Sequence, residues 1–579
     1  MSQKPAELGA LLSGDQTGQK IAYLWNRWNT QRRAWIEEQK ELRNYLFATD
    51  TSSTTQGDNG WKNSTTLPKL TQIRDNLHSN YLSALFPNDD WLKWEAYTSE
   101  DNAKAKREAI ESYMSNKTRG GEFRTTTSRL LYDYIDYGNA FATVSFEASY
   151  KDEDKTVVDF IGPRLVRIDP MAIVFNPTAT SFRETPKIVR TMRTIGELKE
   201  QALSEPDNFY LQAALSKREE MQKVLSGYDI EDNDIAEGYQ VDGFGNLQEY
   251  YQSNMVEVLE FWGDYHDDET GVLHRNKVIT VMDRMSVLRE VDMPQWLGGA
   301  PIYQVGWRHR PNNLWSMGPL NNLVGMQYRI DHLENSKADA YDLSIHPPLI
   351  IVGEVEEFVW APGSTINLDE GGSVTEMGRN LQWVLQANNE IQLLESKMEQ
   401  FAGAPREAMG VRSPGEKTAF EVQSLENAAG KIFQEKITTF ETEVLEPSLN
   451  AMLETSRRNL ETNDVIRVLD TDLGVSKFLT ITQADITAKG KLRPIGARHF
   501  AAQAQLLQNL TGVFSSPLGQ MLAPHTSGIE MAKLVEDTLG LDRFGLFTPN
   551  VAVSEQQQTQ RLAAQAQEDL AAEDEAGLE

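Results

Sequence analysis

One stretch of the sequence comes close to a phosphate-binding loop, Gly410-Val-Arg-Ser-Pro-Gly415-Glu416-Lys417-Thr418. Such a loop needs its lysine directly after the second glycine, because the ammonium group and the amides of the next helix must meet the same phosphates. Here Glu416 separates Gly415 from Lys417, and the flanking pattern is helical where a strand should precede the loop. The sequence therefore favours a flexible connection between two helices over an ATPase site.

Other residues that commonly carry catalysis or bind metals form no motif. The eight histidines are scattered, without His-Glu-x-x-His or any pair at i, i+4 spacing, and the acidic turn His266-Asp-Asp-Glu-Thr-Gly271 lacks the spacing of a calcium loop. No Gly-x-Ser-x-Gly elbow is present, and a chain without cysteine has no thiolate nucleophile, disulfide or zinc ribbon. We therefore expect a protein that is not an enzyme, with no catalytic residue, metal or cofactor.

Aromatic and basic side chains offer two binding hypotheses. Exposed indoles can stack on sugars, but Trp25, Trp28 and Trp35 lie on the apolar stripe of one helical pattern, which favours packing. The segment Trp307-Arg308-His309-Arg310 is a compact basic and aromatic cluster suited to DNA or to a carboxylate-rich neighbour. The net charge of −29 opposes any broad grip on DNA, because such binding needs a basic surface that displaces counterions.

Length and composition indicate a large folded protein. At about 150 residues per domain, 579 residues correspond to roughly four domain equivalents, and 40% apolar with 24% charged residues is an ordinary globular balance. The N-terminus has no apolar signal-peptide core, and no uninterrupted apolar stretch approaches about 18 residues. We expect folding inside the cell and no membrane association.

Helices dominate the first half of the chain and surround a β-rich block. The spacing of apolar residues predicts helices over 17–47, 70–85, 101–117, 122–137 and 196–225. Short β-prone runs predict strands over 140–150, 157–161, 172–175, 187–192, 256–262 and 278–288. Gly138 suits the end of the fourth helix. Residues 49–64 have the composition of a loop, and an acidic linker ends near Gly245.

The second half begins with a long helical pattern that opens at Pro319, counts Tyr328 and Tyr341 among its apolar positions, and stops at His346-Pro347-Pro348. A β segment over 349–384, a helix over 386–401 and a loop over 402–417 follow. Thr418 and Glu421 form a capping box for another long helix, which Pro447 should kink. Further helices lead to a Gln-rich acidic tail. The predicted fold class is α+β.

Several segments, in this order, resemble the portal (head–tail connector) proteins of short-tailed, T7-like bacteriophages. They are Leu85-Phe-Pro-Asn-Asp-Asp-Trp-Leu92 after a helix, Phe123 through Gly138-Asn139 before a strand, Pro319 to Pro348, Glu416-Lys-Thr-Ala419 before the long helix, and the Gln-rich tail. Together they extend over nearly the whole chain.

The resemblance implies a portal-protein fold, with subunits assembled into a dodecameric ring that has wing, stem, clip and crown regions. For this chain it implies a wing over 1–316 with a return at 457–496, stem helices over 317–346 and 385–402, a clip over 347–384, a tunnel loop over 403–417, a long kinked helix over 418–456, a crown over 497–550 and a tail over 551–579.

The resemblance also implies a role and partners. The ring would sit at the portal vertex of the capsid in the virion, after assembly in the host cytoplasm, and double-stranded DNA would pass through it without sequence readout during packaging and ejection. Implied protein partners are the terminase, a tail adaptor protein, the scaffolding and major capsid proteins, and internal core or ejection proteins.

The tunnel loop supplies the expected channel residues, Arg406, Arg412, Glu416 and Lys417. In a cyclic oligomer each cation becomes a ring of positive charge, although a solvated loop cation is an equal interpretation of each. The sequence leaves two competing functions open: a DNA-packaging ATPase (terminase) and a glycan-binding tail component.

Overall fold

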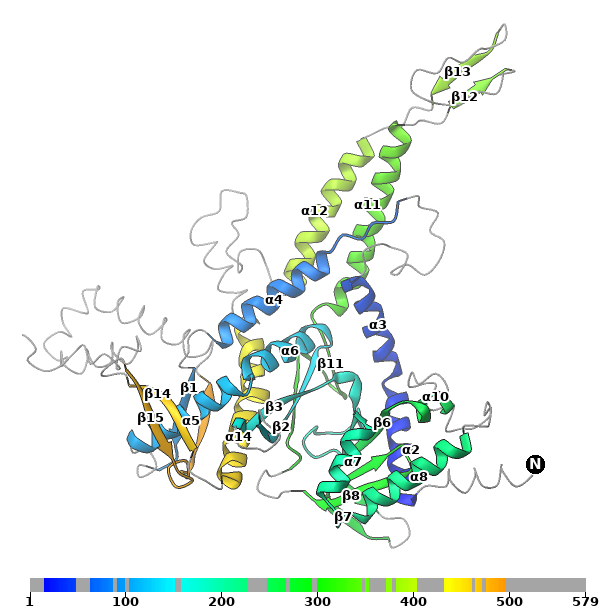
Figure 1. The fold of residues 1–579 in the computed structure, drawn as a ribbon. Helices are drawn as coiled ribbons and strands as arrows, with labels where there is room; N and C mark the ends of the chain where they lie inside the picture. The colour runs from blue at the N-terminus through cyan, green and yellow to red at the C-terminus, as the bar shows by residue number, and fades with distance from the viewer. Residues whose placement is uncertain are drawn as a thin grey trace, which may run out of the picture. The chain divides into compact units, whose positions relative to one another are not determined.

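The computed structural model describes residues 15–47, 63–86, 91–98, 104–150, 158–225, 247–266, 271–293, 299–345, 349–353, 371–376, 382–402, 432–460, 464–470 and 475–494. Helices and strands both occur in groups along these residues, and the paired strands are antiparallel, which agrees with the α+β class (Figure 1). The chain divides into two compact units. One comprises Met1–Phe86 and Lys117–Ser456, and the other comprises Pro87–Asn116 and Arg457–Glu579.

An antiparallel five-stranded sheet forms one core of the first unit. Its strands, in spatial order, are β4 (Ile173–Phe175), β5 (Lys187–Thr194), β6 (Met255–His266), β7 (Leu273–Met282) and β8 (Ser286–Asp292). Helix α2 (Gln16–Gln31) packs Ile21, Trp25 and Trp28 on one face. Helices α7 (Ile195–Ser204) and α8 (Phe209–Leu225) cover the other face. The sheet is therefore buried on both sides.

Two predicted elements of this region are each split in the structure. The helix expected over 196–225 is interrupted between Ser204 and Phe209, where Pro206 cannot donate a helical amide bond. The strand expected over 278–288 is two strands, β7 and β8, joined by a turn in which Asp283 and Arg284 both have positive φ, 50° and 57°. The pair lacks the glycine that usually marks such a turn, so composition alone could not reveal it.

The helix expected over 17–47 is also two helices, α2 and α3 (Arg33–Phe47), and Arg32 lies at the break. The Arg32 side chain is buried and donates to the carbonyl oxygens of Pro170 and Ile173, both at 2.7 Å, and to that of Met171 at 2.6 Å. Burial lowers the pKa of Arg32 to about 9. A distant turn therefore fixes the break, and local periodicity could not reveal it.

A second sheet has the order β3 (Val158–Ile168), β2 (Asn139–Tyr150) and β9 (Ile302–Gly306). Helix α6 (Phe123–Asp136) leads into β2 through Gly138, whose φ of 66° agrees with the predicted helix end. Strand β3 continues through Pro163, beyond the predicted end at residue 161. It can do so because β3 is an edge strand, where a proline need not donate a ladder bond.

The remaining predicted helices of the first half are present with small changes of boundary. They are α4 (Lys69–Leu85) and α5 (Lys104–Gly120). After β9, the strands β10 (Arg308–Arg310) and β11 (Asn313–Met317) form a hairpin.

Two long helices follow. A short 3-10 turn, Asn321–Leu323, precedes α11 (Val324–Ile345), so the α-helix starts later than the predicted opening at Pro319. Helix α12 (Gln382–Ala402) starts within the β segment predicted to reach residue 384. Between them, β12 (Leu349–Val352) and β13 (Ser373–Glu376) form an antiparallel hairpin.

The long helix that contains Pro447 changes its winding just before that proline. Residues 432–440 are α-helical, Glu441–Leu445 form a π-helical turn, and α14 (Glu446–Asn459) continues. A proline in an α-helix clashes with the carbonyl four residues earlier, and the wider π turn relieves that clash. The irregularity expected at Pro447 is therefore present as a π turn.

The second unit contains one strand pair that is far apart in the sequence and one pair of consecutive strands. Strand β1 (Leu92–Ala96) pairs with β16 (Gly490–Pro494), and β14 (Asp464–Asp470) pairs with β15 (Val475–Ile481). Arg457 donates to the carbonyl oxygens of Ile486 and Ala488 at 2.7 and 2.8 Å. The chain after residue 456 thus returns to residues near the start.

Several predicted features lie outside the described residues. They are the tunnel loop, the phosphate-loop-like stretch, the capping box at Thr418 and Glu421, the acidic linker before Gly245, most of the loop over 49–64, most of the turn after His266, and the crown and tail.

Candidate functional site: two long helices and their terminal hairpin

Helices α11 and α12 lie side by side and are joined by the β12–β13 hairpin, and we call this arrangement the helix pair (Figure 1). Arg329 on α11 donates to the Glu390 carboxylate on α12 at 3.1 Å, and both side chains are about half exposed. Lys337 donates to Asn388 at 3.2 Å. Polar bonds at the surface therefore contribute to the register of the two helices.

Three of the four buried residues of α11 are polar, which the predicted apolar periodicity does not anticipate; the fourth is Ile330, one of its apolar positions. Gln327, Asp331 and Asn335 are at most 2% exposed, whereas Tyr328 and Tyr341 are 40% and 44% exposed. These two apolar positions of the predicted helical pattern therefore lie outside the buried face of α11. The element that covers α11 is an extended backbone, which offers amides and carbonyls instead of apolar side chains.

That extended element is residues 63–68, which we call the strap. The amide of Asn63 donates to Asp339 at 2.9 Å, and the amide of Leu67 donates to Asp331 at 3.0 Å. Between them, Asn335 accepts from the amide of Thr65 at 2.8 Å and donates to the carbonyl of the same residue at 3.0 Å.

The strap continues into α4 by a fourth contact of the same kind, from the amide of Leu70 to Gln327 at 3.2 Å. Side chains at every fourth position of α11 thus bind the strap as a neighbouring β-strand would. We call these four side chains the polar ladder: Gln327, Asp331, Asn335 and Asp339.

The ladder works because two periodicities match. Four residues of α-helix rise about 6.0 Å, and two residues of extended chain rise about 6.6 Å. Every second strap amide therefore meets the next ladder side chain, and Pro68, which has no amide hydrogen, falls on an unused position. Where the strap ends, Lys69 forms a buried ion pair of 2.6 Å with Glu399 on α12. Strap and ion pair together hold both long helices.

Asp331 is the ladder residue whose charge is least favourable. Burial raises its pKa to about 6, although the hydrogen bonds from Leu67 and Gln327 favour the carboxylate. Both of those bonds reach Oδ1, and among the described residues Oδ2 has no hydrogen-bond partner. A proton on Oδ2 would therefore remove a buried charge without breaking either bond.

Asp331→Asn is accordingly expected to stabilise the protein at neutral pH. The folded-state pKa is above the unfolded value, so the wild type loses stability as pH rises from about 4 to 6, whereas the variant does not. Above pH 6 we expect the variant's free energy of unfolding to exceed that of the wild type by about 1 kcal/mol, a figure that allows for partial solvent screening. Near pH 4 this difference should disappear. Thermal unfolding at both pH values measures it, with Glu390→Gln as the exposed control. A variant less stable than wild type at pH 7.5 would contradict an unfavourable charge on Asp331.

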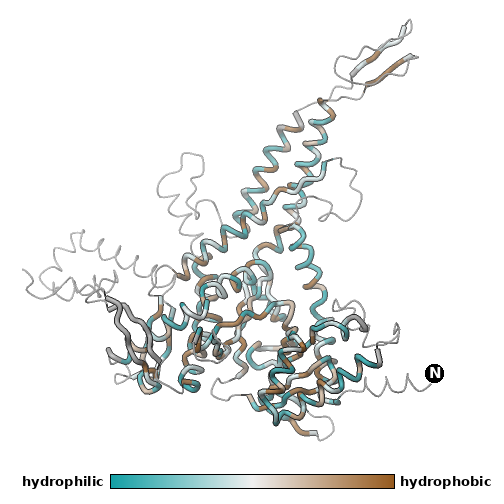
Figure 2. Tube along the Cα trace, viewed as in Figure 1, coloured by the Kyte–Doolittle hydropathy of each residue, from teal (hydrophilic) through white to brown (hydrophobic). Residues whose placement is uncertain are grey.

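The hairpin carries the most exposed apolar strand surface of the helix pair. Ile350, Ile351 and Val352 of β12 are 47%, 37% and 59% exposed, and Figure 2 shows hydrophobic colour on the hairpin. An isolated two-stranded hairpin is marginally stable in water, and a contiguous apolar surface usually marks a contact site. The helices add exposed Ile345, Leu393 and Phe401. Exposed apolar side chains thus lie on both helices and on the hairpin of the helix pair.

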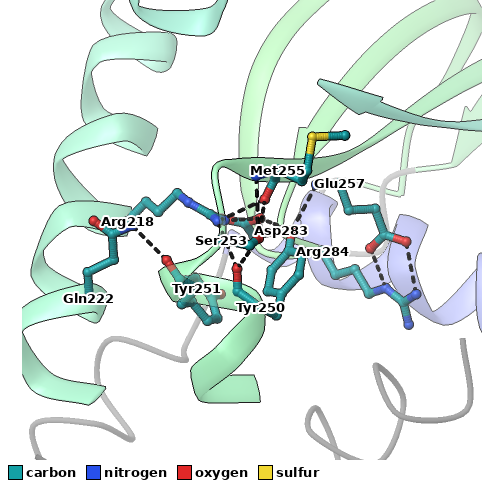
Figure 3. A network of polar contacts seen from close by, with 9 residues as sticks. All are labelled: Arg218, Gln222, Tyr250, Tyr251, Ser253, Met255, Glu257, Asp283 and Arg284. Atoms are coloured by element: carbon teal, nitrogen blue, oxygen red, sulfur yellow. Dashed lines mark hydrogen bonds and ion pairs between the residues drawn. The ribbon is translucent and has the colours of Figure 1, made fainter. Parts of the chain in front are cut away.

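A separate buried network fastens the five-stranded sheet to its helices (Figure 3). Arg218 on α8 binds both oxygens of Asp283 at 2.7 Å, and the hydroxyl of Tyr250, on α10 (Leu247–Gln252), donates to the same carboxylate. Arg284 binds both oxygens of Glu257 at 2.7 and 3.0 Å. Asp283 and Arg284, the two residues with positive φ in the β7–β8 turn, therefore each form an ion pair in which both carboxylate oxygens are bound.

The chemistry of this network is structural. Burial raises the pKa of both Asp283 and Glu257. The charge of Arg218 opposes the shift at Asp283, and the charge of Arg190 opposes the shift at Glu257. Burial also keeps Tyr250 protonated by raising its pKa well above 10. Each carboxylate is already bound to a guanidinium group, so the network positions the turn and is not arranged to transfer a proton.

The structure separates the residues of the predicted basic and aromatic cluster. Trp307 is buried against Tyr81 and Tyr134, with ring centroids 5.5 and 4.9 Å away. Arg308 is exposed. His309 lies 3.3 Å from Ser316, and Arg310 lies 3.8 Å from Glu38. The indole therefore belongs to a core, and the three basic residues alone reach the surface.

Other predicted site residues have clear outcomes. Trp25, Trp28 and Trp35 are at most 8% exposed, so the packing interpretation is confirmed and these indoles cannot stack on a glycan. Arg406, Arg412, Glu416 and Lys417 lie outside the described residues. Apolar periodicity alone misses the polar ladder, although its four-residue spacing is visible in the sequence.

Across the described ranges, no helix combines the length and the apolar character needed to cross a bilayer. In the same part of the chain, no three His, Asp or Glu side chains lie close enough together to hold a metal ion. No protein-family description and no curated protein sequence matches this chain.

Proposed function

We propose that this chain is the portal subunit of a short-tailed, T7-like bacteriophage, and that it forms a ring through which DNA enters and leaves the capsid. The observation that carries the proposal is the helix pair with its exposed hairpin. The order of helix, hairpin and helix, followed by a long helix with a π turn at Pro447, supports it.

The physical character of the described residues fits such a ring. Apolar side chains on both helices remain exposed in a single chain, and a cyclic oligomer would bury such surface between neighbours. The net charge of −29 suits a channel that confines DNA without holding it, because an acidic wall repels phosphate. In this proposal the ring would sit at the portal vertex of the virion.

The proposed partners follow the proposed regions. The hairpin would dock the terminase during packaging and a tail adaptor protein afterwards. Scaffolding, major capsid and internal core proteins would contact the rest of the ring.

Assembly is the first test. The purified chain should form closed rings of about twelve subunits without nucleotide, because the exposed surface of the helix pair is already in place. Native mass spectrometry gives the subunit number and negative-stain electron microscopy shows the central hole. Monomers or trimers alone, over a range of concentrations, would exclude this function.

Docking is the second test. Replacing residues 349–376 by a short Gly-Ser linker should leave rings intact and abolish terminase binding, because the hydrogen bonds of the hairpin are local. Val352→Asp is the milder variant, since it adds a charge to a 59% exposed strand position. Loss of rings in the linker variant would instead show that the hairpin holds the subunits together.

A further inference from the structure

The corner between α7 and α8 exposes three large apolar side chains. Leu203, Phe209 and Tyr210 are 84%, 75% and 63% exposed. Single exposed apolar residues are ordinary, but three on one corner, rimmed by polar residues, are typical of a contact site.

The corner is held in one conformation by its own polar side chains. Asn208 accepts from the amide of Leu211 at 3.1 Å and donates to Glu205 at 3.1 Å. Gln201 donates to Glu205 at 3.2 Å, and Gln212 donates to the carbonyl of Pro206 at 3.0 Å. The apolar side chains are therefore presented by a fixed backbone, which lowers the entropy cost of binding.

A groove of about 480 Å³ lies between this corner and strand β8, and Leu288, Arg289 and Glu290 line its strand side. Strand β8 is the last strand of the five-stranded sheet, and among the described residues no strand pairs with its outer edge. A groove between an edge strand and a helical corner is suited to an extended peptide, which can continue the ladder of main-chain hydrogen bonds.

The charge of the groove indicates what kind of peptide fits. Its lining residues include the carboxylates of Glu205, Asp207 and Glu290 and one guanidinium group, that of Arg289. Glu290 already pairs with Lys277 of β7 at 3.3 Å, so the attraction for a basic partner comes mainly from Glu205 and Asp207. Hydrogen bonds from Asn208 and Gln201 lower the pKa of Glu205, so it is ionised at neutral pH. Two copies of this groove would repel each other, whereas a segment bearing lysine or arginine would be attracted.

We propose that this groove binds an extended basic segment of a partner protein, which pairs with the outer edge of β8 and places apolar side chains against Phe209 and Tyr210. The site does not depend on the proposed portal function.

The test uses the full-length chain and a fluorescein-labelled peptide of about eight residues that alternates lysine and valine, long enough to run along β8. Fluorescence anisotropy should show saturable binding that weakens as salt rises. The double variant Phe209→Ser/Tyr210→Ser should weaken it by about tenfold or more. Tyr23→Ser is the matched control, because Tyr23 is 62% exposed on α2 and does not line the groove, and it should bind like wild type.

Two further peptides separate the parts of the proposal. Glutamate in place of lysine should abolish binding, and proline in place of alternate valines should also abolish it, because proline cannot donate to a β ladder. Equal binding to the double variant, equal binding of the proline peptide, or no saturable binding of the lysine peptide would each overturn the proposal. If the wild type self-associates and the double variant does not, the groove binds a second copy of this chain, and the proposal of a basic partner segment is wrong. Ring assembly of the double variant is measured separately, so either proposal can fail alone.

Discussion

Arg218→Met is expected to lower the free energy of unfolding by about 3–5 kcal/mol, because it leaves the Asp283 carboxylate buried without its cation. Asp283 is 2% exposed, and after the substitution only the Tyr250 hydroxyl remains as a side-chain partner in the network of Figure 3. The turn that carries Asp283 has positive φ and depends on these contacts. We therefore expect the β7–β8 end of the sheet to open first.

Calorimetric unfolding of the full chain measures this effect. Adding Asp283→Asn to Arg218→Met should recover part of the loss, because an amide carries no buried charge and asparagine tolerates positive φ. Burial already raises the pKa of Asp283, and loss of Arg218 should raise it further. The variant's deficit should therefore shrink as pH falls and Asp283 takes up a proton.

The matched control is Lys199→Met. Lys199 pairs with Glu219 at 2.9 Å, but both side chains are about half exposed. Loss of such a pair should cost less than about 1 kcal/mol. Comparable losses in Lys199→Met and Arg218→Met would show that burial of the Arg218–Asp283 pair does not set its effect on stability.

Gly138→Ala is expected to cost about 3 kcal/mol or more. A Cβ at Gly138 would lie 2.2 Å from the amide nitrogen of Gly318 and 2.3 Å from the carbonyl carbon of Met317. The Asn139 side chain keeps these two backbone segments close together, because it donates to the carbonyl of Ser316 at 2.9 Å and accepts from the amide of Ser316 at 3.0 Å. The two backbones cannot separate without breaking these buried bonds.

Gly271→Ala is the control for this substitution. Gly271 has the same φ of 66°, but a Cβ there meets nothing within 4 Å. Its cost should therefore be the backbone strain alone, about 1 kcal/mol. Calorimetry of the two variants separates strain from steric contact, and equal losses would show that the approach of Gly138 to Gly318 is not tight.

The sequence is informative where a signal is local. Helices α4 and α6, and the glycine that ends α6, follow from apolar spacing and from the backbone freedom of Gly138. Pro447 likewise predicts an irregular helix, although the structure shows a π turn before it where the sequence predicts a kink. Each of these features is decided by residues within about one helical turn, so a pattern can reveal it.

One error concerns a local signal, because Pro206 lies within the helix expected over 196–225 and marks the break between α7 and α8. The other errors arise where distant residues decide. The break at Arg32 depends on carbonyls about 140 positions later, and the β7–β8 turn depends on Arg218. The apolar pattern misplaces Tyr328 and Tyr341 because the strap brings main-chain groups to α11. Among the predicted site residues, Trp307 belongs to a buried core and not to a surface contact. The channel residues Arg406, Arg412, Glu416 and Lys417 remain a prediction.

After Asn63, whose side-chain amide donates to Asp339 at 2.8 Å and to Asp342 at 3.0 Å, the strap is recognised through its peptide groups. Ser64, Thr66 and Pro68 contribute no amide to the ladder, and Thr65 and Leu67 contribute only main-chain atoms. Many amino acids other than proline would therefore serve at positions 65 and 67, whereas the four α11 side chains have few substitutes. The strap should therefore tolerate more substitutions than the ladder. A library randomised at positions 65 and 67 should contain a far larger fraction of folded proteins than a library randomised at the four ladder positions of α11.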